Sequence, residues 1–389
     1  MSRRRNKTER GVALIMVLGT LALVGAVIGE FQYTSRVDLE LAFNGRDAVQ
    51  AEYNALSALR LRAMLLRHAR RLDSGAAAAG AALGIDPQMM PPIGQLIEMI
   101  PVDCGLMSAI ISETAGEEAP AGDESGGEVF AGECTATSVS EHAKISINVL
   151  ARSSQGASQQ VSTFLLGLLS NPALERHFDK DDRSGSHAES PVELVSAITD
   201  WIDVDNNQSV NPAADEDRLY EYLKDSYRAK NAPFDSLAEL QLVHGISDEL
   251  YDLLKEHVSI YSDNTQIELA TASVEQIFVG LMGSLRQGSR FDELAIHPGT
   301  GLLFQAITEM RQLGGAGFAF LKVPTLVALI QQFGLDSLID TNAVQQLFTD
   351  RQNATWYTLY AEGRVGNAGR RIRAVFQASE AQFYYVRIE

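Results

Sequence analysis

The chain has 389 residues, of which 46% are apolar and 21% are charged, so it is long enough for one to three domains and is not composed like a disordered chain. Its formal net charge is −18, and this acidic balance argues against a nucleic-acid-binding protein, which needs a basic surface. Residues 1–10 nevertheless carry a local charge of +4, which leaves −22 for the rest of the chain.

An apolar segment of 18 residues, 12–29, follows the basic start, and Thr20 is its one clearly polar side chain. This length is near the lower limit for a helix that crosses the roughly 30 Å hydrocarbon core of a membrane. Because Lys and Arg precede the segment, we expect its N-terminal end to stay in the cytoplasm and the acidic remainder to lie across the membrane.

Several kinds of N-terminal segment could explain this basic and then apolar pattern. A cleaved secretory signal has a shorter apolar region and a small-x-small cleavage site, and no convincing site follows Gly29. A twin-arginine signal is disfavoured because Arg4 and Arg5 precede Asn-Lys-Thr rather than an apolar pair. A buried core helix leaves the basic flank unexplained. We therefore predict an uncleaved or specially processed membrane anchor.

The helical pattern continues beyond the apolar segment. Residues 37–72 contain no proline, and their apolar residues recur at helical spacing. These residues are Leu41, Ala48, Ala55, Leu59, Ala63 and Leu66. A continuous helix over 12–72 would be about 90 Å long, with Gly29 and Gly45 as points where it could break. We expect its first half to lie in lipid or in a helical bundle, and its second half to pack on a globular head.

The rest of the chain predicts an α+β fold. An acidic, low-complexity segment over 113–133 is typical of a solvated loop, and alternating apolar residues over 143–150 predict a strand. Amphipathic helical patterns fill 161–348, and strand patterns return over 357–365, 371–376 and 383–388. One strand before a helical block and three strands after it indicate a sheet domain with a large all-α insertion.

The two cysteines, Cys104 and Cys134, flank the acidic segment. In an oxidising compartment they could form a disulfide that closes a loop of about 30 residues and stabilises the fold by about 3–4 kcal/mol. Two unpaired thiols are the alternative, because sequence spacing does not establish the geometry of a bridge.

A run of oxygen-bearing side chains resembles the first half of an EF-hand loop. Its alternate positions are Asp203, Asp205, Asn207, Ser209 and Asn211. Calcium needs six to eight oxygen ligands, so such a run is a candidate calcium site.

The run departs from the EF-hand pattern in two places. Gln208 stands where the loop usually has glycine, and Ala214 stands where a closing glutamate is expected. Glu216 could close the site instead, with Asp200 or Asp217 nearby. A solvated acidic loop without metal is the competing interpretation. A second cluster, at Asp179, Asp181 and Asp182, is more typical of a surface loop.

Motifs for catalysis and for nucleic-acid binding are missing from the sequence. It contains no His-Glu-x-x-His, P-loop, G-x-G-x-x-G, G-x-S-x-G or Cys-x-x-Cys motif, so we predict no enzymatic activity. The turn over 243–246 resembles half of a helix-hairpin-helix, but acidic residues at Asp248, Glu249 and Asp252 follow it. We therefore expect a structural hairpin there and no contact with nucleic acid.

The N-terminus also resembles the leader of type IV pilin-like proteins. A short basic leader ends at Gly11 and the apolar helix starts at Val12, as at a prepilin-peptidase site where the new N-terminus is methylated. Most of this superfamily has glutamate at the fifth mature position, where this chain has Met16. Loss of that carboxylate is typical of the K-type minor pseudopilins of the type II secretion system.

The middle of the chain is similar to the K-type signature almost residue by residue. The matching stretches are 198–205, 215–220 and 227–240, followed by the turn at 243–246 and the helix start at 270–272. Leu269 replaces the usual asparagine at that helix start. The resemblance covers nearly the whole chain and is densest over 198–274.

The resemblance implies a type IV pilin-like fold with an inserted all-α domain. The expected parts are a leader over 1–11, a transmembrane helix over 12–29, a pilin-like head over 30–160, a helical insertion over 161–349 and completing strands over 350–389. It also implies structural calcium in the insertion, bound by a subset of Asp200, Asp203, Asp205, Asn207, Glu216 and Asp217.

For function, the resemblance implies a non-enzymatic subunit of the inner membrane with a periplasmic head. Its expected partners are the prepilin peptidase, the I- and J-type pseudopilins at the tip of the pseudopilus, the H type as a further candidate, and secreted exoproteins. The alternative is a signal-anchored periplasmic binding or scaffold protein unrelated to secretion.

Overall fold

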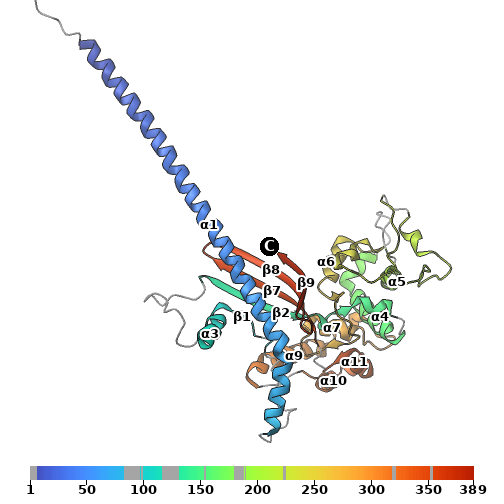
Figure 1. The fold of residues 1–389 in the computed structure, drawn as a ribbon. Coiled ribbons are helices and arrows are strands. Elements are labelled where there is room, and N and C mark those ends of the chain that lie inside the picture. The colour runs from blue at the N-terminus through green and yellow to red at the C-terminus, as the bar shows by residue number, and fades with distance from the viewer. Residues whose placement is uncertain are drawn as a thin grey trace, which may run out of the picture.

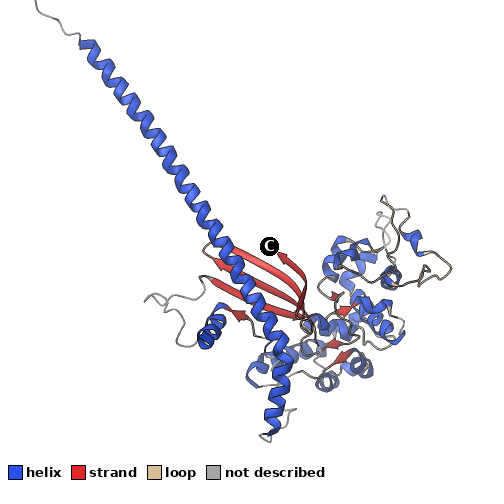
Figure 2. Cartoon of the chain, viewed as in Figure 1, coloured by secondary structure: helices blue, strands red, loops and turns tan. Residues whose placement is uncertain are grey.

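The computed structural model describes residues 7–82, 97, 100–115, 131–152, 155–178, 188, 190–221, 225–317, 321–350 and 354–389. A long N-terminal helix projects from the molecule and crosses one face of an antiparallel sheet, and a helical domain lies beside that sheet (Figure 1). Figure 2, coloured by secondary structure, shows that the long strands form one sheet and that the inserted domain is almost entirely helical. The predicted α+β fold with an inserted helical domain is therefore confirmed.

Helix α1 (Lys7–Ala82) is continuous through both Gly29 and Gly45. Its 76 residues correspond to about 114 Å at 1.5 Å per residue. The helix continues past Leu72 into an alanine-rich stretch, which the sequence analysis did not assign to it. Alanine has the highest helix propensity of the amino acids, so this extension is the expected result.

The two halves of α1 have different surroundings. Apolar side chains such as Leu14 and Leu41 are 62% and 63% exposed, so Leu41 does not pack on the head as its spacing predicted. Burial begins at Ala51 and continues through Ala55 to Leu66, where α1 crosses the sheet. Only the second half of α1 is therefore part of the head's core.

The sheet has five antiparallel strands in the order β1-β2-β7-β8-β9. They are β1 (Val102–Asp103), β2 (Glu133–Ser140), β7 (Trp356–Val365), β8 (Ala368–Gln377) and β9 (Gln382–Ile388). The three C-terminal strands match the sequence prediction and are joined by short turns, and the pairing of β8 with β9 has a register shift between Val375 and Phe376. Helix α3 (Cys104–Ala115) follows β1 directly and precedes β2 in the chain.

The strand predicted over 143–150 is wrong. This segment forms the 3₁₀ helices η3 (Glu141–Ala143) and η4 (Ile147–Ala151), with β3 (Ile145–Ser146) between them. Its polar residues face inwards rather than towards solvent: Ser146 is buried against Ser262, and the Asn148 amide donates to two backbone carbonyls. The alternation of apolar and polar residues therefore did not reflect one buried and one solvated face.

The inserted domain is built from short helices around one apolar core. Its helices are α4 (Gln155–Leu169), α5 (Pro191–Ile202), α6 (Asp248–Leu254), α7 (Val274–Met282), α8 (Phe291–Ile296), α9 (Pro298–Gly317), α10 (Val323–Gln332) and α11 (Thr341–Leu347). Its remaining elements are η5 (Pro172–Phe178), η6 (Glu216–Leu219), η7 (Leu237–Leu242), η8 (Leu335–Ser337), β4 (Val258–Ser259), β5 (Ile267–Glu268) and β6 (Phe348–Thr349). Two parallel pairs, β3 with β4 and β5 with β6, bring distant segments of the domain together.

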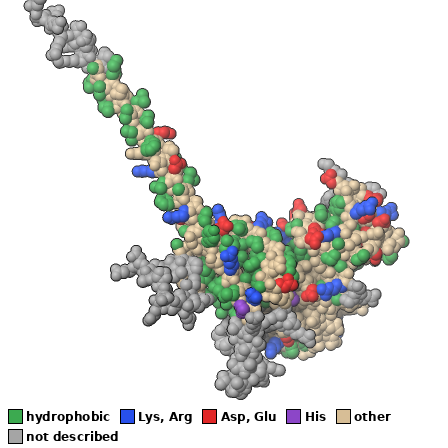
Figure 3. Space-filling model, viewed as in Figure 1, with side chains coloured by type: hydrophobic (Ala, Val, Ile, Leu, Met, Phe, Trp, Pro, Cys, Tyr) green, Lys and Arg blue, Asp and Glu red, His purple; other side chains and the backbone are tan. Residues whose placement is uncertain are grey.

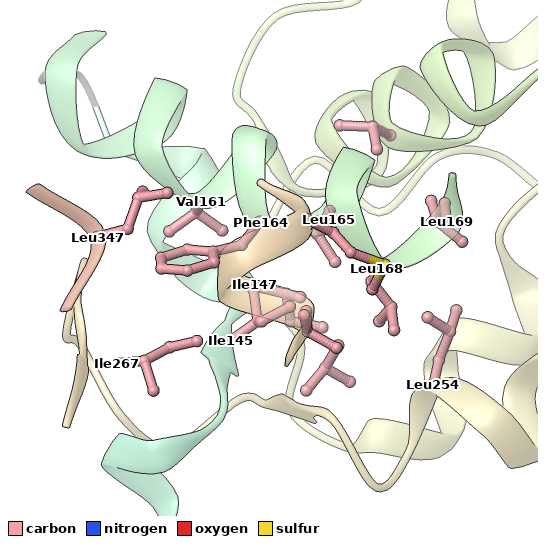
Figure 4. Packing of buried hydrophobic residues seen from close by; sticks show 14 of the residues in the cluster. Ile145, Ile147, Val161, Phe164, Leu165, Leu168, Leu169, Leu254, Ile267 and Leu347 are labelled. Carbon is pink, nitrogen blue, oxygen red and sulfur yellow. The ribbon is translucent and has the colours of Figure 1, made fainter. Parts of the chain in front are cut away.

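The core of this domain starts earlier in the chain than predicted. Ala143 and Ile147 belong to its buried cluster, and Figure 4 shows Ile147 beneath Phe164 and Leu165 of α4. Residues 143–160 therefore pack with the insertion, whereas the sequence analysis assigned them to the head.

A buried polar contact joins the two domains. Lys144 Nζ and Glu141 Oε1 are 2.8 Å apart, and the Thr358 hydroxyl of β7 donates to the same Glu141 oxygen over 2.6 Å. Nearby, the rings of Tyr261 and Trp356 stack with centroids 5.6 Å apart. The insertion is thus fixed to the sheet at the start of β7.

Candidate metal centre

The candidate site forms where α5 ends. Ser190 caps the helix start, accepting a hydrogen bond from the Glu193 amide, and Pro191 occupies its first turn. Asp203 is the C-terminal cap, and Asp200 precedes it by three residues, so both carboxylates lie on the same side of the helix end.

Glu216 reaches the same place from the other end of the loop. It opens η6, which Asp215 caps by accepting a hydrogen bond from the Asp217 amide. The loop folds back on itself through an antiparallel bridge between Asn207 and Asp215. The Glu216 amide then donates to the Asn206 carbonyl over 3.3 Å. These backbone contacts bring Glu216 against the end of α5.

The three carboxylates form one compact cluster. One oxygen each from Asp200, Asp203 and Glu216 lies within 4.8 Å of the others. Asp200 and Glu216 are 3% and 1% exposed. Asp200 Oδ1 accepts a hydrogen bond from the Ser209 amide over 2.9 Å. Asp203 Oδ1 and both Glu216 oxygens are buried without a hydrogen-bond partner in the described part of the chain.

Such a cluster is unfavourable on its own. Burial of an unpaired carboxylate is costly, and three like charges close together add repulsion. Burial first, and the neighbouring carboxylates second, raise the pKa of Asp203 to about 6 and the pKa of Glu216 to about 8. Burial also raises the pKa of Asp200. Unpartnered carboxylate oxygens in this arrangement fit a hard divalent cation such as calcium, which prefers oxygen ligands.

Three other predicted ligands lie outside this cluster. Asp205 Oδ1 accepts a hydrogen bond from the Asn207 amide over 2.8 Å, which forms a local turn. Asn207 is exposed and takes part in the backbone bridge to Asp215. Asp217 accepts a hydrogen bond from the Ala229 amide and lies 3.6 Å from Arg228. The alternate positions thus do not converge as they do in an EF-hand loop.

The structure adds an oxygen that the sequence analysis did not single out. Asn231 has a positive φ of 50°, and its amide nitrogen donates to the Asp205 carbonyl and to Asn206. Its Oδ1 is buried without a hydrogen-bond partner among the described residues. Nothing in the spacing of the acidic run could have identified a residue so far along the chain.

Three aromatic rings pack together beside the loop. Trp201 contacts Tyr220 and Tyr227 edge-on, with ring centroids 5.5 and 6.1 Å apart, and the two tyrosine rings are 5.2 Å apart. Trp201 belongs to α5 and Tyr220 follows η6. The rings therefore fix the two elements that carry the carboxylates.

The remaining predicted sites lie elsewhere. Cys104, at the start of α3, and Cys134, in β2, are joined by a disulfide in the structure. Gly11 and Val12 lie in the first turns of α1. Asp179, Asp181 and Asp182 lie outside the described residues, as does most of the acidic segment over 113–133.

Comparison with known proteins places this site within a recognised domain. The family described as "Type II secretion system (T2SS), protein K" matches residues 143–263, which include all three clustered carboxylates. A type II secretion system protein K from Pectobacterium carotovorum is 25% identical over 202 residues, covering 50% of this chain and 53% of the relative. The protein K of Klebsiella pneumoniae is 32% identical over 81 residues, covering 21% of this chain and 24% of the relative.

The alignments therefore span about half the length of one curated relative and a quarter of the other. Among solved structures, the crystal structure of the GspK-GspI-GspJ complex from enterotoxigenic Escherichia coli matches with a TM-score of 0.44 and 16% identity. That match covers 67% of this chain and 80% of the other. The chain therefore contains a domain, over residues 143–263, that matches the type II secretion system protein K family, and it is similar in sequence to two K proteins.

Proposed function

We propose that this chain is a minor pseudopilin of the type II secretion system that is anchored in the inner membrane and caps the tip of the pseudopilus. The observation that carries the proposal is the division of α1. Its first half exposes a continuous apolar surface, whereas its second half forms the core of the head. A helix of this kind has one half available for lipid or for other helices.

The exposed half of α1 meets the requirements of a membrane anchor. Within the described residues it is the one helix long and apolar enough to cross a membrane, and none of its most apolar stretch is buried. Figure 3 shows apolar side chains along this half of α1. The head then lies in the periplasm, as the basic leader predicts.

The leader is removed after Gly11 by the prepilin peptidase, and Val12 becomes the methylated N-terminus. Met16 then occupies the fifth position of the mature chain and is 66% exposed. Its side chain cannot form the ion pair that a glutamate would form with the N-terminus of a neighbouring subunit. This difference favours a terminal position over a repeating one.

The inserted domain also favours a terminal position. Gly363, near the end of β7, packs against Ala51 of α1, whereas Trp356, at the start of β7, packs against Tyr261 of the insertion. The insertion is therefore attached at the end of the sheet farther from the membrane half of α1. There it would obstruct another subunit stacked above, while the I-, J- and H-type pseudopilins could pack alongside α1 and exoproteins could reach the tip.

A structural calcium ion completes the proposed subunit. Asp200, Asp203 and Glu216 would hold it, with Asn231 as a further oxygen beside the loop. The ion would neutralise the three buried carboxylates and so fix the loop between α5 and η6. Its role is in stability, and we assign the chain no catalytic activity.

Co-purification tests the proposed assembly. The full-length tagged chain is co-expressed with candidate I-, J- and H-type subunits and extracted from membranes in mild detergent. We expect the I- and J-type subunits to be retained through affinity and size-exclusion steps, and an unrelated single-pass periplasmic protein to be lost. Recovery of the chain without either subunit would favour the unrelated binding or scaffold protein.

A further inference from the structure

Strand β9 forms an open edge of the sheet. It is the last strand in the sheet order, next to β8, and Figure 1 shows it at one side of the sheet. The opposite edge is β1, which has only two residues and is followed directly by α3. A very short edge strand is a common protection against pairing with another chain. Strand β9 has seven residues, and those from Tyr384 onwards are all exposed, so it lacks this protection.

Two residues of β9 direct their backbone groups away from the sheet. Arg371 and Glu389 exchange both of their backbone hydrogen bonds, at 3.0 and 2.8 Å. In an antiparallel pair of strands, hydrogen-bonded and non-hydrogen-bonded residue pairs alternate. Ile388, which pairs with Ile372, is therefore not hydrogen-bonded to β8, and neither is Val386 two residues earlier. Their N–H and C=O groups point outwards, and no backbone partner reaches them within the described residues.

The side chains of these two residues lie at the margin of the apolar core of the head. Ile372 and Ala374, directly across from them on β8, belong to the buried cluster. Val386 and Ile388 lie on the same face of the sheet, because paired residues share a face, but they are 50% and 47% exposed. Helix α1 packs mainly on β2, β7 and β8, so it leaves this margin uncovered. An added strand would cover both side chains and extend the core.

Strand β9 carries few of the features that keep an edge strand unpaired. It contains no proline and no lysine. Its one charged residue, Arg387, lies 3.1 Å from Glu389, which balances the charge locally. The register shift with β8, between Val375 and Phe376, lies at the other end of the strand. Outward N–H and C=O groups on such an edge are matched by the backbone of an extended peptide, as in β-strand addition.

We propose that β9 is a docking edge for an extended segment of another protein, which adds antiparallel to β9 as a sixth strand and carries apolar side chains at alternate positions. Antiparallel pairing continues the pattern of the existing five strands. The apolar side chains of the added strand would lie opposite Val386 and Ile388, on the face that α1 covers. β-Branched and aromatic residues fit these positions best.

A second copy of this chain does not fit this edge in a membrane. Two β9 strands that pair antiparallel into one continuous sheet are related by a twofold axis perpendicular to the sheet. Helix α1 lies along one face of the sheet, so this axis would make the two α1 helices point in opposite directions. They could not then enter one membrane from the same side. The inference rests on the proposed function in this respect, because it uses the membrane anchor to exclude a second copy.

The test uses the full-length chain in detergent and a fluorescein-labelled heptapeptide in which threonine and valine alternate. Fluorescence anisotropy measures binding. In the proposed pairing the valines lie opposite Val386 and Ile388 in hydrogen-bonded pairs, so the valine N–H groups point towards β9 and the threonine N–H groups point away. Two N-methylated peptides separate these two edges of the added strand. One is methylated at the valines and the other at the threonines.

A variant of the edge gives an independent measurement. Val386→Pro removes the outward N–H without removing a hydrogen bond to β8, as proline at a solvent-facing edge position allows. Val386→Thr is the matched control, because it keeps both the N–H and the branched side chain. The methylated peptides are compared on the unmodified chain, so their result does not depend on how well the proline variant folds.

We expect the unmethylated and the threonine-methylated peptides to bind equally, and the valine-methylated peptide to bind about tenfold more weakly, because it loses backbone hydrogen bonds. Val386→Pro should weaken binding of the unmethylated peptide by a similar factor, and Val386→Thr should not. No binding to the unmodified chain, or equal binding of the two methylated peptides, would overturn the docking edge.

Light scattering of the chain alone in detergent checks the occupant. A dimer that Val386→Pro disrupts would overturn the inference, because a second copy would then occupy the edge. The intact mass of the same preparation reports removal of the leader, which does not involve β9. Failure of the docking edge is therefore distinguishable from failure of the proposed function.

Discussion

Gly363 of β7 packs so closely on α1 that a Cβ atom at this position would overlap the Ala51 carbonyl oxygen. This approach allows the second half of α1 to lie directly on the sheet, with alanines such as Ala55 and Ala58 at the contact. The head is therefore built on a helix whose first half is left exposed. The proposed role in the membrane and in a helical bundle depends on this contact.

Replacing Gly363 tests how strongly α1 is held. Gly363→Ala adds a methyl group where the helix backbone already lies, so we expect the free energy of unfolding to fall by about 1–3 kcal/mol. Gly369→Ala is the matched control, because its Cβ atom would meet only the Arg364 side chain at 4.0 Å. Chemical denaturation followed by circular dichroism measures both variants. Equal losses of stability would contradict the close packing.

Removal of calcium is expected to destabilise the inserted domain. A ligand present at 100 times its Kd stabilises a fold by about 2.7 kcal/mol, so excess EGTA should lower the Tm and added calcium should restore it. Asp203→Ala should abolish this response, and Asp205→Ala should only weaken it, because Asp205 lies outside the cluster. Asp263→Ala, at a side chain 72% exposed, should leave the response unchanged. A Tm that does not change on chelation would exclude the site.

Without calcium, stability should fall as the pH rises from about 4 to about 8. The folded-state pKa values of Asp203 and Glu216, about 6 and about 8, lie above the ordinary values of 3.8 and 4.5. The folded protein therefore binds more protons than the unfolded protein in this range. That stabilisation is complete below the unfolded-state pKa values and is lost as the pH passes through the folded-state values. Thermal melts in EGTA, repeated across this range, measure the slope.

Two comparisons check the origin of that slope. Calcium should flatten it, since the bound ion neutralises the ionised carboxylates. Glu216→Gln should also reduce it, because the variant has one fewer buried carboxylate to ionise. A calcium-free protein that becomes more stable towards pH 8 would contradict the assignment of these pKa shifts.

Loss of the disulfide should destabilise the head rather than the insertion. Cys104 and Cys134 are 30 residues apart, so removing the bond should cost about 3–4 kcal/mol in the chain-entropy description. Cys104→Ser/Cys134→Ser should therefore unfold at lower denaturant concentration. Its Tm should still shift on calcium chelation, because the metal centre belongs to the other core. If the double variant lost both its stability to denaturant and its Tm response to chelation, the two domains would unfold as one unit.

The sequence was most informative where local patterns are long. Helix α1 was predicted correctly from its apolar and then amphipathic periodicity. Strands β7 to β9 were predicted correctly from their β-branched and aromatic residues. Strand β2 was missed because its inward positions are Cys134, Ala136 and Ser138, which are too small or too polar to give an apolar alternation. The reverse error at 143–150 arose because Ser146 and Asn148 are satisfied by buried partners that no local pattern records.

The candidate site was predicted in composition but not in detail. Asp203 was identified in the run of oxygen-bearing side chains, Glu216 as the residue that could close the site, and Asp200 as an acidic residue nearby. The bridge between Asn207 and Asp215 depends on how the whole loop folds, and it directs Asp205 and Asn207 away from the cluster. Asn231 is placed by a backbone contact with Trp201, so only the tertiary structure identifies it.

The mass of the intact chain extracted from membranes tests the central claim most directly. A pseudopilin requires cleavage between Gly11 and Val12, followed by methylation of the new N-terminus. We expect a mature chain of 378 residues that begins at Val12 and carries the added mass of one methyl group. Expression of the chain in cells that lack the prepilin peptidase should leave the leader in place. A chain that still begins at Met1 when the peptidase is present would contradict the assignment.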